Sequence, residues 1–544
     1  MKFPNMYTGS TTTKRLEPQT IQWAGLNKNP YIQDNQFSST TNLSTKNYPW
    51  LSPRPARTAV VTLSGTGHAL FNAPAKVCWV DDTNFKYDAA TKGTVTASSK
   101  SMVDFNGRIG IFPDKKYYDY VEDSFATMLG KCRLMNYGYD SNGDVDYSQT
   151  TKIRNKNIIP VLPSTAYTLV NDKSYTVANV YYYDTNLNFI STTQVDFASF
   201  TTPATCYYFN FDITGTDLTC AVSITNAVYP AETSIPDIDY ATTLNNRVWA
   251  VEGDNIYACA LGDINDWTTF TVPTTLTTDS WTVDTGTPGD FTGIVTYKNH
   301  VYAFKNNSMW KQFGDNALNF EFVRISGVGC TSSKSIVEVK DKLFFLNGDG
   351  VYVYEGGQPE LISYDLNETY TSGVAGGDVR YYYISLYNGS TYNLYVYDVE
   401  TNIWIQEDNS NITEFIHQYT AAVPNGYILA LASDNKIYGY DLGSETVTMT
   451  LITKEWDENS FNKKGVSALN IMADLETDST LTVHTRINNG AWNLVKSAYA
   501  TTDKNSFRIP IFPKRANHFQ LKFTMIGEGK IELVSREMYV GGKP

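Results

Sequence analysis

The sequence predicts an all-β protein, and three observations lead to that prediction. Aromatic residues make up 14% of the 544 residues, with 39 Tyr and 26 Phe, whereas charged residues make up only 18%. Aromatic and β-branched side chains suit pleated, half-buried strands, and the abundant Asn, Asp and Gly suit tight turns. Short alternating strands separated by such turns recur along most of the chain. We expect a β-propeller-like core with an inserted small β-sandwich of jelly-roll type and a C-terminal β-sandwich.

The length and the changes of pattern divide the chain into five segments, which form four parts. A chain of 544 residues is too long for one ordinary hydrophobic core. The parts are an extended N-terminal arm over 1–56, a propeller-like core over 57–149 and 229–454, an insert over 150–228, and a C-terminal β-domain over 455–544.

The N-terminal arm is rich in Thr, Ser, Asn and Pro, shows little periodicity, and ends in the stiff segment LSPRP at 51–55. Such a segment is either disordered or lies across the rest of the protein or a neighbouring subunit. Its aromatic residues favour the second alternative, because they need a surface to bury against. These residues are Trp23, Tyr31, Phe37, Tyr48 and Trp50. We expect that deleting residues 1–50 impairs assembly more than folding.

A two-strand unit recurs in the predicted core. In each copy two hydrophobic strands flank a turn of Gly, Asp or Asn, which is the strongest short-range signal for a hairpin. The later copies recur at about 40 to 50 residues, the spacing of a four-stranded propeller blade. A plain β-sandwich with many hairpins is the alternative. The clearest copies begin at Arg247, His300, Lys342 and Tyr427, and weaker copies begin at Lys76, Gly107 and Arg380.

The repeat is interrupted between the copies at Gly107 and Arg247, where residues 150–228 have a β pattern of their own. The segment YYYDTNLNFIS, followed by Thr202 and Pro203, resembles small jelly-roll modules, often carbohydrate-binding, that are inserted into phage tail and baseplate proteins. The possible glycan contact is the run Tyr181, Tyr182 and Tyr183, because aromatic faces suit pyranose rings. Strand alternation sends the middle ring to one face and the outer two to the other, so one set is expected in the core.

Longer strands follow residue 455 and predict a compact C-terminal β-domain. The N-terminus, MKFPNMYTGSTTT, lacks the apolar segment of a signal peptide, and no apolar run reaches membrane-spanning length. We therefore expect synthesis in a cytoplasm and no membrane span. Six scattered cysteines without a CxxC pair indicate buried thiols rather than a disulfide or metal framework. Only Cys206 and Cys220 lie close enough in sequence to suggest a pair, and whether they pair is left open.

Catalytic signatures are missing from the sequence. The five histidines are isolated, and the chain has no HExxH, no Gly-x-Ser-x-Gly and no Walker-type loop. Residues 140–146 (DSNGDVD) alternate oxygen ligands as a calcium loop does, but the glycine is misplaced and the closing Glu is absent, so a solvated turn is favoured. We expect no enzyme activity, no catalytic residue, no cofactor and no metal.

The net charge of −13 opposes electrostatic binding to DNA, since that binding depends on Lys and Arg contacts to phosphate. An acidic or mixed surface would nevertheless suit a channel past which DNA slides without sticking.

Three segments in order along the chain resemble phage tail nozzle and DNA-stabilisation (tail tubular) proteins. They are GLNKNPYIQDNQFSSTTNLS with YPWLSPRPAR, the copy NRVWAVEGDNIYACALGDINDW, and the run from Phe519 to Gly542. The resemblance implies a homo-oligomeric ring, of six subunits, that contacts portal, adaptor and other tail proteins in the virion. The hypothesis is a structural ring that continues the DNA channel for ejection and attaches other tail parts. The alternative is a host-surface glycan-binding protein of the tail tip or baseplate.

Overall fold

The computed structural model describes residues 14–16, 19–20, 22–74, 76–128, 134–155, 158–171, 173–197, 199–218, 220, 222–225, 235–267, 277–420, 423–457, 463–499, 505–510 and 515–540. The chain forms two compact units, one of residues 1–72 with 334–544 and one of residues 73–333. The described regular structure is almost entirely β, with two short 3-10 helices at Ser333–Ser335 and Tyr364–Leu366. The predicted all-β class is confirmed. Within the described residues, no helix has the length and apolarity needed to cross a membrane.

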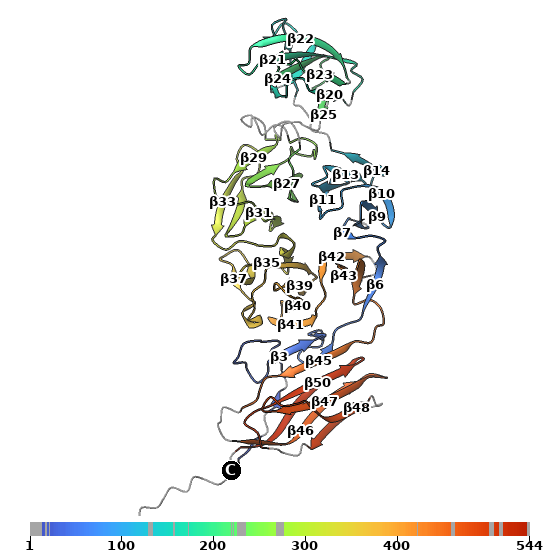
Figure 1. The fold of residues 1–544 in the computed structure, drawn as a ribbon, viewed down its shortest axis with the longest axis vertical. Coiled ribbons are helices and arrows are strands. Elements are labelled where there is room, and N and C mark those ends of the chain that lie inside the picture. The colour runs from blue at the N-terminus through green and yellow to red at the C-terminus, as the bar shows by residue number, and fades with distance from the viewer. Residues whose placement is uncertain are drawn as a thin grey trace, which may run out of the picture. The chain divides into compact units, whose positions relative to one another are not determined.

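Four-stranded antiparallel meanders repeat in both units (Figure 1). The first unit contains β34 (Val337–Val339), β35 (Lys342–Asn347), β36 (Gly350–Tyr354) and β37 (Glu360–Leu361), followed by β38 (Ser372–Gly377), β39 (Tyr381–Tyr387), β40 (Tyr392–Asp398) and β41 (Ile403–Asp408). The second unit contains three such meanders. The first is β11 (Ser101–Phe105), β12 (Arg108–Phe112), β13 (Lys116–Asp119) and β14 (Ser124–Thr127), and the second is β26 (Tyr240–Leu244), β27 (Arg247–Glu252), β28 (Asn255–Ala258) and β29 (Trp281–Asp284). The third is β30 (Gly293–Tyr297), β31 (His300–Lys305), β32 (Ser308–Phe313) and β33 (Glu321–Ser326). The second unit also contains the run β8 (Val77–Asp81), β9 (Asn84–Tyr87) and β10 (Ala90–Thr94).

All seven hairpins predicted from the sequence are present among the described strands. They are β8–β9, β12–β13, β27–β28, β31–β32, β35–β36, β39–β40 and the pair of β43 (Val423–Ala432) with β44 (Lys436–Tyr440). Several first strands join their hairpin through a two-residue turn in which both residues have positive φ. Lys298 and Asn299, with φ of 45° and 59°, form such a turn between β30 and β31. Turns of this type match the right-handed twist of the strands that they connect.

The first strands of successive meanders lie side by side within each unit. In the first unit β38 contacts both β34 and β42 (Ile412–Thr420), and in the second unit β26 contacts both β11 and β30. Neighbouring propeller blades pack their first strands in this way. The closing of the blades into a ring stays a prediction.

An N-terminal strand completes the last meander of the first unit. β42, β43 (Val423–Ala432) and β44 (Lys436–Tyr440) come from consecutive chain, but the fourth strand is β6 (Arg57–Thr62). The pairing of Lys436 with Thr62 and of Tyr440 with Arg57 joins segments that are far apart in sequence.

The insert consists of two sheets, as a small β-sandwich requires. It begins at β15 (Leu134–Asn136), earlier than the predicted residue 150, because β15 pairs with β18 (Lys152–Asn155). The larger sheet continues through β24 (Tyr208–Thr214), β21 (Val177–Tyr183) and β22 (Phe189–Asp196), and β19 (Ile159–Pro160) also pairs with β24. The smaller sheet contains β23 (Ser199–Thr201), β20 (Ala166–Asn171) and β25 (Val222–Thr225), and a separate hairpin joins β16 (Gly138–Tyr139) to β17 (Val145–Asp146).

The C-terminal sandwich takes strands from both ends of the chain. One sheet has the order β3 (Phe37–Thr41), β45 (Thr448–Thr453), β50 (Phe519–Ile526), β47 (Thr480–Ile487) and β48 (Asn493–Tyr499). The other has β1 (Lys14–Leu16), β51 (Gly529–Val540), β46 (Lys464–Leu475) and β49 (Asn505–Pro510), and β2 (Gln19–Thr20) also pairs with β51. The domain therefore begins before the predicted boundary at residue 455, because β45 belongs to it. The predicted arm supplies edge strands to this domain.

The arm lies on its own chain through both hydrogen bonds and burial. Figure 1 shows β3, coloured blue, beside the orange β45. Trp23 and Phe37, which are 3% and 0% exposed, belong to one hydrophobic cluster with residues of β41, β46 and β50. Two of the five aromatic residues expected to be buried are not, since Tyr31 is 96% exposed and Trp50 is 40% exposed.

Candidate functional site

The predicted glycan contact lies in the interior of the insert. Tyr181, Tyr182 and Tyr183 are only 4%, 3% and 6% exposed. Alternation along β21 divides them as expected: Tyr182 packs in the core between the two sheets, and the outer two pack around Tyr139 on the opposite face. No face of the three rings is open to a pyranose, so the proposal that they form a stacking platform is wrong.

Hydrogen bonds explain why the outer tyrosines are buried on the second face. The Tyr181 hydroxyl donates to Asp212 Oδ2 at 3.0 Å, and the Tyr183 hydroxyl donates to the Gly143 carbonyl at 2.6 Å. Burial and the Asp212 carboxylate raise the pKa of Tyr181 well above its usual value. The hairpin of β16 and β17 covers this face, and a sequence pattern read strand by strand contains no signal for that covering layer.

We expect Tyr182→Ala to destabilise the insert by about 3 kcal/mol, because it removes a buried aromatic ring from a closed core. Differential scanning calorimetry of the full chain measures the effect as a lower transition temperature. The control is Tyr207→Ala, because the Tyr207 side chain is 42% exposed. A decrease of similar size in its transition temperature would show that the destabilisation does not come from loss of core packing.

The acidic loop at 140–146 satisfies its own backbone. Asp140 Oδ1 accepts the N–H groups of Asn142 and Asp144 at 2.8 and 3.0 Å, and Asp146 Oδ1 accepts the N–H of Ser148 at 2.8 Å. This arrangement is the side-chain-capped turn that Asp favours. Within the described residues, no group of three or more His, Cys, Asp or Glu side chains is placed to hold a metal ion.

The two cysteines of the insert form no disulfide. Both lie in its core, and the free thiol of Cys206 donates to the Tyr208 carbonyl at 3.2 Å. Burial raises the pKa of the Cys206 thiol, which disfavours the thiolate form that reacts as a nucleophile.

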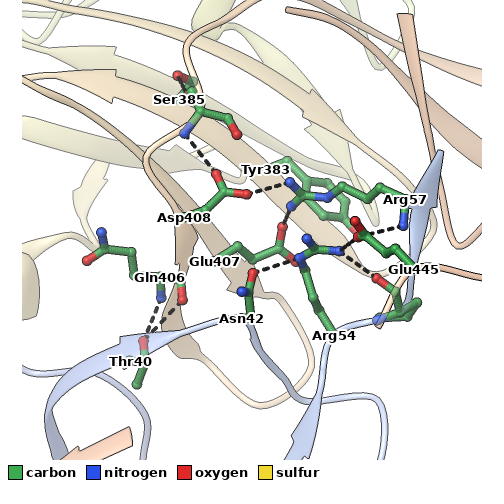
Figure 2. A network of polar contacts seen from close by, with 12 residues as sticks. Thr40, Asn42, Arg54, Arg57, Tyr383, Ser385, Gln406, Glu407, Asp408 and Glu445 are labelled. Carbon is green, nitrogen blue, oxygen red and sulfur yellow. Dashed lines mark hydrogen bonds and ion pairs between the residues drawn. The ribbon is translucent and has the colours of Figure 1, made fainter. Parts of the chain in front are cut away.

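A set of charges joins the N-terminal segment to later parts of the first unit, and we call it the arm clasp (Figure 2). It consists of Arg54 near the end of the arm, Arg57 directly after the arm, and three carboxylates from later in the chain, Glu407, Asp408 and Glu445. Arg54 follows β5 (Ser52–Pro53), and Arg57 begins β6. Glu407 and Asp408 end β41, and Glu445 precedes β45.

Arg57 is the centre of the clasp. Its guanidinium pairs with Glu407 and donates to Asp408 Oδ2 at 2.7 Å, and its backbone N–H donates to Glu445 Oε1 at 3.0 Å. The guanidinium also lies over the Tyr440 ring, 4.1 Å from the ring centroid. The Arg57 and Glu407 side chains are 8% and 7% exposed, so each charge is stabilised by the other rather than by water.

Arg54 extends the clasp to the neighbouring loops. It donates to Asn42 Oδ1 at 2.8 Å and to Glu445 Oε1 at 2.7 Å. Burial and the nearby Arg57 charge lower the pKa of Arg54, and Glu445 opposes both. The backbone of the arm follows the same path, since the Asn42 N–H donates to the Glu407 carbonyl at 2.7 Å.

A second set of charges fastens the arm to the C-terminal sandwich. Asp34 Oδ2 accepts a hydrogen bond from Arg536 Nη2 at 2.8 Å, and Asp34 Oδ1 lies 2.9 Å from Lys454 Nζ. The Arg536 guanidinium lies 4.1 Å from the centroid of the buried Trp456 ring. Burial opposes ionisation of Asp34, but these two cations outweigh it and lower the pKa of its carboxyl group.

The clasp predicts a loss of stability at both ends of the pH scale. Burial alone would raise the pKa of Asp408, but Arg57 and the N–H and hydroxyl of Ser410 lower it. The stability that a carboxylate with a lowered pKa contributes is present above about pH 4 and is lost as the pH falls through its folded-state value. Burial raises the pKa of Tyr440 to about 12, with Arg57 opposing. Its contribution is present below about pH 10 and is lost as the pH rises toward 12.

Urea unfolding followed by tryptophan fluorescence at pH 3, 7, 10 and 12 tests this dependence. We expect the midpoint to be highest between pH 7 and 10. The variant Tyr440→Phe removes the titrating hydroxyl, which has no hydrogen-bond partner, and should flatten the decline between pH 10 and 12. An unchanged alkaline decline in that variant would assign the effect to other groups.

No protein-family model matches the chain, and no curated protein matches it. Among solved structures, a Bacteroides fragilis protein described as exported is similar over 76% of this chain and 88% of its own, with 9% identity and a TM-score of 0.26. An exo-β-1,3-galactanase of Phanerochaete chrysosporium is similar over 74% of this chain and all of its own, with 8% identity and a TM-score of 0.19. Both likenesses are too distant to assign a function.

Proposed function

We propose that this chain is a non-enzymatic structural subunit of a bacteriophage tail, which forms a ring around the DNA channel and attaches other tail parts. The observation that best supports the proposal is the path of the N-terminal arm. Arm strands β1 and β2 pair with β51, β3 pairs with β45, and β6 completes the sheet of β42, β43 and β44. Pulling either end of the chain would load several sheets together, which suits a mechanical role.

The charge of the chain agrees with this role. A net charge of −13 disfavours electrostatic binding of DNA phosphates, so genomic DNA could pass along the chain without being bound. The glycan-binding alternative has lost the three tyrosines that supported it, because they are buried.

Immunogold electron microscopy of intact phage particles from the source culture tests the proposal. Label at the neck or along the tail axis supports it. Label at peripheral fibres or at the tail tip would overturn it in favour of host recognition, and absence from all particles would remove the virion assignment itself. Antibody against an unrelated host protein is the control for background label.

A further inference from the structure

The second unit contains a buried arginine that forms no salt bridge with a carboxylate of the described residues. Arg247 begins β27 and is 2% exposed. Its guanidinium donates to the carbonyls of Cys259, Asp279 and Thr277 at 2.7, 2.6 and 2.7 Å. Asp266 and Asp279 attract its charge only from beyond salt-bridge distance, and the guanidinium lies 5.4 Å from the centroid of the Phe320 ring. Three of the five guanidinium N–H groups are therefore used, and two are left.

A buried donor without a partner lies two residues away on the same strand. Trp249 is 1% exposed, and its indole N–H makes no hydrogen bond. Residues i and i+2 of a strand share a face, so this side chain and Arg247 lie on one side of β27. The Trp249 ring is held by edge contacts with Trp281 and Phe320, at centroid distances of 6.1 and 4.8 Å. The indole N–H groups of Trp23 and Trp456 are also buried without a partner, but Trp249 lies beside Arg247, and an acceptor bound there would satisfy its N–H.

Arg247 and Trp249 both line one small pocket of about 160 Å³. Asn245, Gln312, Asp315 and Phe320 are also in its wall, and Leu261 at its edge is 46% exposed. The wall also contains the Asp315 carboxylate, whose Oδ1 accepts the side-chain amides of Asn316 and Asn319 at 2.7 and 2.8 Å, and these hydrogen bonds lower the pKa of Asp315. Burial lowers the pKa of Arg247, and the Cys259, Asp279 and Asp266 side chains oppose this effect without cancelling it.

We propose that this pocket binds a small oxyanion, which accepts hydrogen bonds from the guanidinium of Arg247 and the indole N–H of Trp249. A negatively charged acceptor compensates the arginine charge and satisfies the unpaired donor, whereas a neutral acceptor does only the second. The volume accommodates a sulfate or phosphate ion, or the carboxylate end of a larger ligand such as an acidic sugar. This site is separate from the arm clasp and does not depend on the proposed structural role.

Isothermal titration calorimetry of the full chain at constant ionic strength tests the site with sodium sulfate, sodium phosphate and sodium glucuronate, and uses sodium chloride as the background salt. We expect saturable binding of at least one probe. Binding of sulfate or phosphate alone identifies a free inorganic anion, and tighter binding of glucuronate identifies a carboxylate ligand. Absence of saturable heat with all three would overturn the proposal.

The variant Trp249→Phe separates the indole N–H from the aromatic packing. It should weaken binding about tenfold, because it removes one hydrogen bond to a charged group. The matched control Trp281→Phe changes a neighbouring ring that is not in the pocket wall, and it should retain the affinity within about twofold. Equal affinities of Trp249→Phe and the parent would overturn the assignment.

A crystal soak gives a test that needs no variant. Selenate has the shape of sulfate and scatters anomalously, so an anomalous peak beside Arg247 would support the site. Ordered selenate elsewhere on the chain with none beside Arg247 would overturn it.

Discussion

Replacing Phe37 with alanine is expected to lower the free energy of unfolding by about 3 to 5 kcal/mol, the usual range for removing a fully buried phenylalanine side chain. Phe37 is 0% exposed and stacks on Trp23 with a ring-centroid distance of 4.7 Å. Its N–H donates to the Gly25 carbonyl, so the ring is held at the edge of the sheet that β3 forms with β45. The loss is measured as a shift in the urea midpoint of the full chain, followed by tryptophan fluorescence.

The arm supplies its own control. Tyr31 belongs to the same segment but is 96% exposed, so Tyr31→Ala should change the free energy of unfolding by less than about 0.5 kcal/mol. This pair of variants replaces the expectation that deleting residues 1–50 impairs assembly more than folding. The deletion removes Trp23, Phe37 and Leu43 from the largest core cluster of the first unit, so folding should fail first. A Phe37→Ala chain that is fully stable but cannot assemble would restore the earlier expectation.

Local signals predicted the repeated hairpins well because each hairpin is determined within about 15 residues of sequence. The strands β35 and β36, for example, are short hydrophobic runs, buried over most of their length, on both sides of the turn at Gly348 and Asp349. The first strands of the meanders give a weaker signal in the sequence. β38 has the sequence SGVAGG, which contains three glycines and little hydrophobic alternation. The glycines are needed there, because a Cβ atom at Gly376 would lie 2.4 Å from the Phe415 side chain.

Long-range pairing could not be predicted from the sequence. Arg57 and Glu407 are 350 positions apart, and neither lies in a motif that names its partner. The same limit applies to β3, whose sequence FSSTT suits a strand but does not specify β45 as its neighbour. The Tyr181–Tyr183 run shows the opposite difficulty. Its alternation was predicted correctly, but the hairpin that buries the second face begins outside the predicted insert, at Gly138.

Replacing Arg57 with methionine is expected to destabilise the protein by about 3 kcal/mol, because the substitution leaves Glu407 buried without its partner. Asp408 contributes less to this cost, since its side chain is 26% exposed and water can screen it. The exposed pair of Lys46 and Asp441, each 59% exposed, is the matched control, and Lys46→Ala should cost less than about 1 kcal/mol. Both values come from urea unfolding of the full chain at pH 7.

A double variant separates the two contributions to this destabilisation, which are the desolvation of the unpaired Glu407 carboxylate and the loss of the other contacts of Arg57. The desolvation of a buried carboxylate is removed when the group is made neutral, so Arg57→Met with Glu407→Gln should be more stable than Arg57→Met alone. If the double variant loses as much as the sum of the two single variants, Arg57 and Glu407 do not act as a pair, and the arm is held by its apolar contacts. If stability is partly recovered, the charges determine where β6 docks, and the hydrophobic residues of the arm supply most of the free energy.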